Sequence, residues 1–142
     1  MAAERDKDLR TAEREFEAAI AIAHHSGALV DLAAFYGRHG KDALAITAAQ
    51  RTIAADTAVD DNVVEAASVL WDAKQPVAAE AALRGYLAHG ERSDRAPVFK
   101  VHMMLGRLLA ENGQPEAARG EYKAALALAS QFAPARKGLA SL

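Results

Sequence analysis

The stretch Val98–Ala125, VFKVHMMLGRLLAENGQPEAARGEYKAA, determines how the whole chain is interpreted. In its first half, Leu105 and Leu109 are four residues apart, which places them on one face of a helix. Its second half repeats small and aromatic residues at spacings of four and three: Ala118, Tyr122 and Ala125. Between the halves stands Gly-Gln-Pro, where glycine favours a turn and proline favours the first turn of a helix. The stretch therefore predicts two amphipathic helices joined by a tight turn.

The composition of the chain favours an all-α fold. The chain has 142 residues, a hydrophobic fraction of 51% and only four prolines. Much of the hydrophobic fraction is alanine, which has the highest helix propensity and lets helices pack closely. The length suits one domain with a sizeable core.

The charge balance and the missing cysteines exclude several kinds of site. The chain has 17 lysines and arginines and 19 aspartates and glutamates. This nearly neutral balance gives no reason to expect binding to nucleic acid or to an anionic membrane surface. Without cysteine the chain has no disulfide, thiolate metal site or cysteine nucleophile. No apolar run approaches the roughly 18 residues of a membrane span, and the start MAAERDKDLR lacks a secretory signal. This pattern favours the cytoplasm, and a domain from an exported or membrane-tethered parent would share it.

Similar patterns recur along the chain and predict further helices. We expect a helix over residues 8–25, helix pairs over 26–57, 60–90 and 95–130, and a capping helix over 133–142. Gly40 is expected to end one of these helices, and Asp60 or Asp61 to cap another.

The helix pairs are repeats of one unit. The segments DAKQPVAAEAALRGYL and ENGQPEAARGEYKAAL align without a gap at an offset of 111 − 72 = 39 residues. Aligning Ala45 with Ala79 gives an offset of 34, and aligning Ala12 with Ala45 gives 33. Helix pairs repeating at about 34 residues are typical of a helical solenoid.

These residues resemble the tetratricopeptide repeat, whose pattern is W-x2-L-G-x2-Y, then A-x3-F, then P. The best match is Leu105-Gly106-x2-Leu109 followed by Ala118-x3-Tyr122. Weaker copies are Leu32-Ala33-x2-Tyr36 with Ala45-x3-Ala49, Ala66-Ala67-x2-Leu70 with Ala79-x3-Leu83, and Ala12-x3-Phe16 alone. The family's tryptophan is replaced in every copy, by Leu29, Val63 and His102. The resemblance implies a right-handed superhelix made of half a repeat, three full repeats and a final helix.

The half repeat at the start predicts an uncovered apolar stripe. A solenoid repeat buries its face only against neighbours, so Phe16 and Ile20 should remain partly exposed. An upstream part of a longer parent protein or a second copy of the chain would then cover them.

The resemblance also implies a concave groove lined by the first helix of each repeat. Carrying that face over by helical register gives these groove residues: Val30, Ala34, Arg38, Val64, Ser68, Trp71, Asp72, Lys100, Met103, Arg107 and Glu111. The alternative for single members is that Val64 and Met103 pack between repeats, and that Arg107 and Glu111 form a solvated pair.

The sequence therefore predicts a non-catalytic module that binds a peptide or protein segment in its groove. The alternative is a structural or oligomerisation segment of a larger protein, assembling through its end helices. The clamp by which some family members bind a terminal carboxylate is absent, since Val30, Ala34 and Glu65 occupy its positions. No cofactor or metal is expected, because the five histidines lack ligand spacing and no phosphate loop or nucleophile motif is present.

Overall fold

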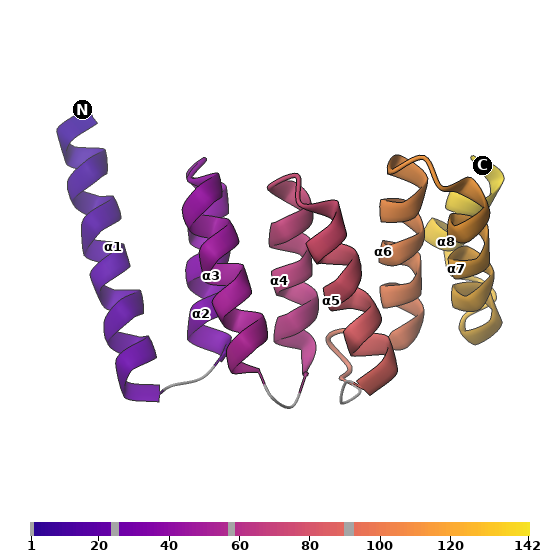
Figure 1. Ribbon diagram of the computed structural model, residues 1–142, viewed down its shortest axis with the longest axis horizontal. Helices are drawn as coiled ribbons and strands as arrows, with labels where there is room; N and C mark the ends of the chain where they lie inside the picture. The colour runs from indigo at the N-terminus through magenta and orange to yellow at the C-terminus, as the bar shows by residue number, and fades with distance from the viewer. Residues whose placement is uncertain (1, 24–25, 57–58, 90–92) are drawn as a thin grey trace.

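The computed structural model describes residues 2–23, 26–56, 59–89 and 93–142, which form eight helices and no strand (Figure 1). The helices are α1 (Ala2–Ala23), α2 (Ser26–Arg38), α3 (Asp42–Ala55), α4 (Asp61–Asp72), α5 (Pro76–His89), α6 (Val98–Glu111), α7 (Pro115–Leu128) and α8 (Ala133–Ala140). The predicted all-α class is confirmed. No helix in these ranges has the length and apolar character needed to cross a membrane.

The helices form a row of antiparallel pairs. The most extensive packing joins α2 to α3, α4 to α5 and α6 to α7, and α3 with α4 and α5 with α6 connect the pairs. Figure 1 shows the row running from α1 at one end to α7 and α8 at the other. Each pair covers the apolar face of the next, which is how a helical solenoid is stabilised.

Turns of one geometry join the two helices of each pair. Gly40, Lys74 and Gly113 have φ values of 70°, 62° and 74°. The residue after each one donates its amide to a carbonyl five residues back, at 2.8–2.9 Å. This is a left-handed helix cap, which glycine adopts without strain. The predicted cap at Gly40 is confirmed, and Lys74 takes the same conformation with a side chain.

Small residues allow the helices of each pair to approach closely. Ala45, Ala79 and Ala118, equivalent in the three repeats, are each 0% exposed. In the last repeat, Gly106 lies against the Tyr122 ring, which a Cβ atom at Gly106 would meet at 2.8 Å. The helices of a pair lie so close together that only small residues fit at these positions of the repeat.

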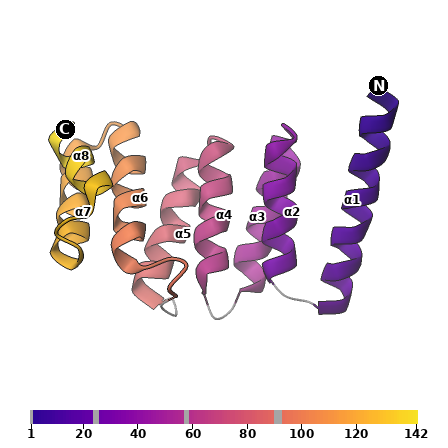
Figure 2. The same cartoon turned by 180° about the vertical axis from the view of Figure 1, so that it is seen from behind.

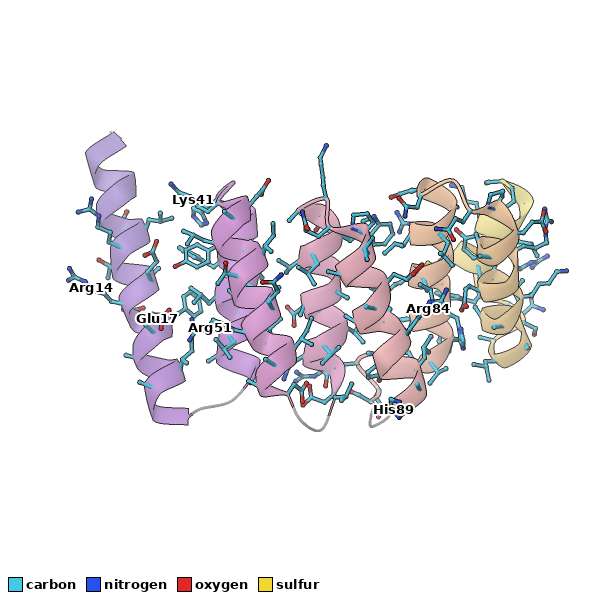
Figure 3. The ribbon with its side chains drawn as sticks, viewed as in Figure 1. Arg14, Glu17, Lys41, Arg51, Arg84 and His89 are labelled. Carbon is cyan, nitrogen blue, oxygen red and sulfur yellow. The ribbon has the colours of Figure 1, made fainter. Side chains whose placement is uncertain are left out.

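The N-terminal helix is only partly covered at Phe16 but is buried at Ile20. The rings of Phe16 and Phe35 are 5.5 Å apart and Phe16 is partly buried, whereas Ile20 is only 9% exposed. The predicted partial exposure therefore holds for Phe16 and is wrong for Ile20. The reason is that α2 packs directly on α1. Glu17 and Arg51 also approach to 3.5 Å from α1 and α3 (Figure 3). Self-association through this helix stays a prediction.

The helix also begins earlier than predicted, at Ala2 instead of Asp8. The extra residues, AAERDK, are mostly good helix formers and include no large apolar residue. Hydrophobic periodicity cannot detect such a segment, because only its propensity favours a helix.

The connection before α6 is fixed to α5 by one side chain. The Tyr86 hydroxyl donates to the Ala96 carbonyl at 2.7 Å and accepts from the Ser93 amide at 3.3 Å. Tyr86 and Ala96 are both buried, at 3% and 6% exposure. The polar connection that lengthens the repeat offset to 39 residues is therefore part of the packed structure where it is described.

Candidate peptide-binding groove

The first helices of the three repeats present equivalent positions on one side of the solenoid. Figure 2 shows this side, with α2 and α4 in front of α3 and α5. The small residue shared by the three first helices, Ala33, Ala67 or Gly106, gives a common reference point. Residues at the same distance after it are equivalent. One, four and five residues later, the sets are Ala34, Ser68 and Arg107; Gly37, Trp71 and Ala110; and Arg38, Asp72 and Glu111. Members of these sets line two surface pockets.

The first pocket, named the α2/α4 pocket, has a volume of about 460 Å³. Its lining residues are Ala34, Gly37 and Arg38 of α2, Asp42 and Ala45 of α3, and Glu65, Ser68, Val69, Asp72 and Ala73 of α4 and its end. Three of its charged side chains are carboxylates and one is an arginine. None of the four is in an ion pair with another residue of the described ranges.

The second pocket, named the α6/α8 pocket, has a volume of about 680 Å³. Its lining residues are Arg107, Ala110 and Glu111 of α6, Tyr122 of α7, Ala133, Pro134, Lys137 and Gly138 of α8, and Ser141 and Leu142 beyond it. Here two cations face one carboxylate, so the balance of charge is opposite to that of the α2/α4 pocket.

Tyr122 supplies a polar atom to this second pocket from the core. Its side chain is only 3% exposed, and within the described part of the chain its hydroxyl forms no hydrogen bond. Burial raises the pKa of Tyr122, with opposing smaller contributions from Arg107 and Glu111. The phenol therefore stays protonated at neutral pH and can donate a hydrogen bond to a ligand.

Trp71 lies between the two pockets and connects two repeats. Its indole Nε1 donates to the Glu111 carboxylate at 2.9 Å. The Arg107 guanidinium carbon lies 5.6 Å from the centre of its ring, within the range of a cation–π interaction. Trp71 therefore contacts two other predicted groove residues, Arg107 and Glu111.

The comparisons with known proteins support the fold. No family model and no curated protein sequence matches the chain. Two solved structures, titled as crystal structures of MamA and of MamA protein, superimpose with a TM-score of 0.72 at 18% sequence identity. They cover 96% of this chain, which spans 77% and 72% of theirs. The chain has the fold of an α-helical repeat solenoid.

The structure divides the predicted groove residues by depth. Ala34, Ser68, Arg38 and Asp72 line the α2/α4 pocket, and Arg107 and Glu111 line the α6/α8 pocket. Trp71 lies between the pockets, and Lys100 is exposed on α6 without lining either of them.

The other predicted groove residues belong to the core. Val30 is 1% exposed and Val64 is 7% exposed, while Met103, at the equivalent position, is partly buried against the same core. Placing Val30 and Val64 on an open binding surface is therefore wrong. For Val64 the burial favours the alternative, packing between repeats. The neighbouring first helix covers these positions, because α2 packs directly on α4.

Several pocket residues were not predicted. Asp42 reaches the groove because the left-handed turn at Gly40 brings the start of α3 beside the end of α2. The sequence predicts Tyr122 only as part of the repeat pattern, and Lys137 only as part of the capping helix. The sequence does indicate the position of Asp42. A charged residue directly after a tight turn lies beside the end of the preceding helix, and here that end carries groove residues.

Two of the histidines in the described ranges, His39 and His102, have structural partners, and His89 is exposed at the end of α5. His39 Nδ1 donates to the Phe35 carbonyl at 2.8 Å, and His102 Nδ1 lies 2.7 Å from a Glu121 carboxylate oxygen. Glu121 also contacts Arg84 of α5, at 3.7 Å. No three metal-ligating side chains are grouped in the described ranges, and His24 and His25 lie outside them.

Proposed function

We propose that this chain is a non-catalytic protein-interaction module that binds an extended or helical segment of a partner protein. The binding surface is the groove formed by the α2/α4 pocket, Trp71 and the α6/α8 pocket. One observation carries the proposal: equivalent positions of successive first helices line two pockets on the same side of the solenoid.

The size and chemistry of these pockets suit side chains of a peptide. Volumes of about 460 and 680 Å³ exceed what one side chain fills, so backbone and neighbouring residues would share each pocket. Apolar lining from alanine, valine and proline is combined with charged residues at the edges. Such a surface binds apolar anchor residues and uses its charges to fix their register.

Trp71 makes binding measurable, because it is the chain's single tryptophan. A peptide selected for binding from a displayed library of random dodecapeptides is expected to shift or quench its emission. An emission spectrum that is unchanged at saturating peptide would contradict binding in this groove.

A matched pair of arginine variants tests the location. Ser68→Arg fills the α2/α4 pocket from a half-buried position on α4 and should lower peptide affinity at least tenfold, about 1.4 kcal/mol. Gln50→Arg adds the same side chain to an exposed site on α3 that lines neither pocket, and should leave affinity unchanged. Equal affinities for both variants would refute the groove as the binding site.

A further inference from the structure

The two pockets of the groove differ in the sign of their charge. The α2/α4 pocket contains Asp42, Glu65 and Asp72 against Arg38, a formal balance of −2. The α6/α8 pocket contains the side chains of Arg107 and Lys137 against that of Glu111, a formal side-chain balance of +1. The chain as a whole is close to neutral, with a formal charge of −2, so this separation is a local property of the groove.

The carboxylates of the α2/α4 pocket are available to a ligand. They come from two helices, Asp42 from α3 and both Glu65 and Asp72 from α4, and all three are exposed. None is in an ion pair with a described residue. A lysine or arginine side chain entering this pocket would neutralise part of the carboxylate charge, whereas an acidic side chain would be repelled.

The α6/α8 pocket offers three donors to an acidic group. Lys137 is exposed and forms no ion pair within the described residues. Arg107 lies over the Trp71 ring, and stacking leaves the N–H groups at the edge of a guanidinium free to donate. The third donor is the hydroxyl of Tyr122, whose side chain is 97% buried and which has no partner among the described residues.

The single carboxylate in the α6/α8 pocket does not cancel these donors. Glu111 accepts the indole N–H of Trp71 at 2.9 Å, which directs one of its oxygens toward α4. Gly138 lets α8 lie directly against the Tyr122 ring, because a Cβ atom there would collide with the ring and its hydroxyl. Arg107, Lys137 and Tyr122 therefore line one pocket together, and Glu111 is the one acidic side chain among its lining residues.

From this arrangement we infer that the groove binds a segment of a partner protein whose charge changes sign along its length. A lysine or arginine side chain occupies the α2/α4 pocket, and an aspartate or glutamate side chain occupies the α6/α8 pocket. An apolar residue between them packs on Trp71, which lies between the pockets. The order of charges fixes the orientation of the segment along the solenoid. This inference rests on the proposed function and specifies its ligand.

Charge-reversed variants test the inference by selection of peptides. A displayed library of random dodecapeptides is selected on the wild-type chain, on Glu65→Lys/Asp72→Lys and on Arg107→Glu/Lys137→Glu. Wild-type binders are expected to carry a basic and an acidic residue at a fixed separation around an apolar residue. The first variant should exchange the basic residue for an acidic one, and the second should exchange the acidic residue for a basic one.

Affinities give the same test quantitatively. A wild-type binder is expected to lose roughly tenfold in affinity for each reversed charge at low salt, and less as salt screens the pockets. Lys123→Glu, an exposed reversal on α7 that lines neither pocket, is the control and should change nothing. Lys137→Gln, a milder change at an exposed site, keeps the test valid if a double variant fails to fold.

The possible failures are distinguishable. Groove-bound peptides whose charges do not follow the reversals would overturn the inference and leave the proposed function intact. A selection that yields only peptides insensitive to Ser68→Arg would overturn the proposed function and the inference together. Preferential selection of peptides that match this chain's own sequence would replace the partner segment by a second copy of the chain.

Discussion

Replacing Asp56 by asparagine is expected to stabilise the protein at neutral pH. Asp56 follows the last residue of α3 and is only 6% exposed. One of its carboxylate oxygens accepts the Asp60 amide at 3.0 Å, and Asp60 in turn caps α4 by accepting from Asn62 at 2.8 Å. Asparagine retains the acceptor toward the Asp60 amide and removes a buried charge beside a second carboxylate.

The magnitude follows from the pKa of the buried carboxyl. Burial, followed by the hydrogen bond with the Asp60 side chain, raises the pKa of Asp56 from 3.8 to about 6. At about 1.4 kcal/mol per pKa unit, this corresponds to roughly 3 kcal/mol. Because the folded state binds the proton more tightly than the unfolded chain, the free energy of unfolding falls as pH rises from about 4 to about 6 and is level above that.

Urea denaturation measured across this pH range checks the expectation. The stability advantage of Asp56→Asn over wild type should be close to zero near pH 4 and should reach about 3 kcal/mol above pH 6.5 or so. Asp61→Asn is the control, since it removes a carboxylate from the first turn of α4, where the helix dipole favours one, and should destabilise slightly at neutral pH. A stability difference for Asp56→Asn that stays constant with pH, or a loss of stability at neutral pH, would refute the reasoning.

Four further substitutions test the packing of the repeats by thermal or urea unfolding. Lys74→Gly relieves the left-handed conformation of a side-chain-bearing residue and should stabilise by about 1 kcal/mol; a loss would show that the lysine side chain has an essential contact. Gly138→Ala should destabilise by about 1–3 kcal/mol through collision with Tyr122, whereas Gly120→Ala, in open space on α7, should stabilise by roughly 0.5–1 kcal/mol. Tyr86→Phe leaves a buried carbonyl without its donor and should cost about 1–2 kcal/mol; an unchanged midpoint would mean that water replaces the hydroxyl.

Most of the fold could be predicted from local sequence. The spacing of Leu105, Leu109, Ala118 and Tyr122 defines two helix faces, and the Gly-Gln-Pro turn separates them. The apolar spacing and the turn residues determine structure within a few residues of the chain. They can therefore be recognised without knowledge of the neighbouring helices. The start of α1 is not predicted for the corresponding reason, because its first turns carry no large apolar residue to define a face.

The candidate groove was only partly predictable. Helical register assigns Ser68 and Arg107 to one side of their helices, and both line pockets in the structure. Register alone also assigned Val30 and Val64 to that side, although they are buried. Angle around a helix is a local property, whereas depth depends on how closely the adjacent repeat packs.

The sequence by itself determined the all-α class, the helix pairs and their repetition, because helix propensity, apolar spacing and turn residues act over short distances. Only the tertiary structure decided which first-helix residues stay accessible, because that depends on the contact of α2 with α4 and of α8 with α6. It also placed Asp42, Tyr122 and Lys137, from second helices and the capping helix, beside first-helix residues. The charge asymmetry of the groove exists only after those distant segments are packed together.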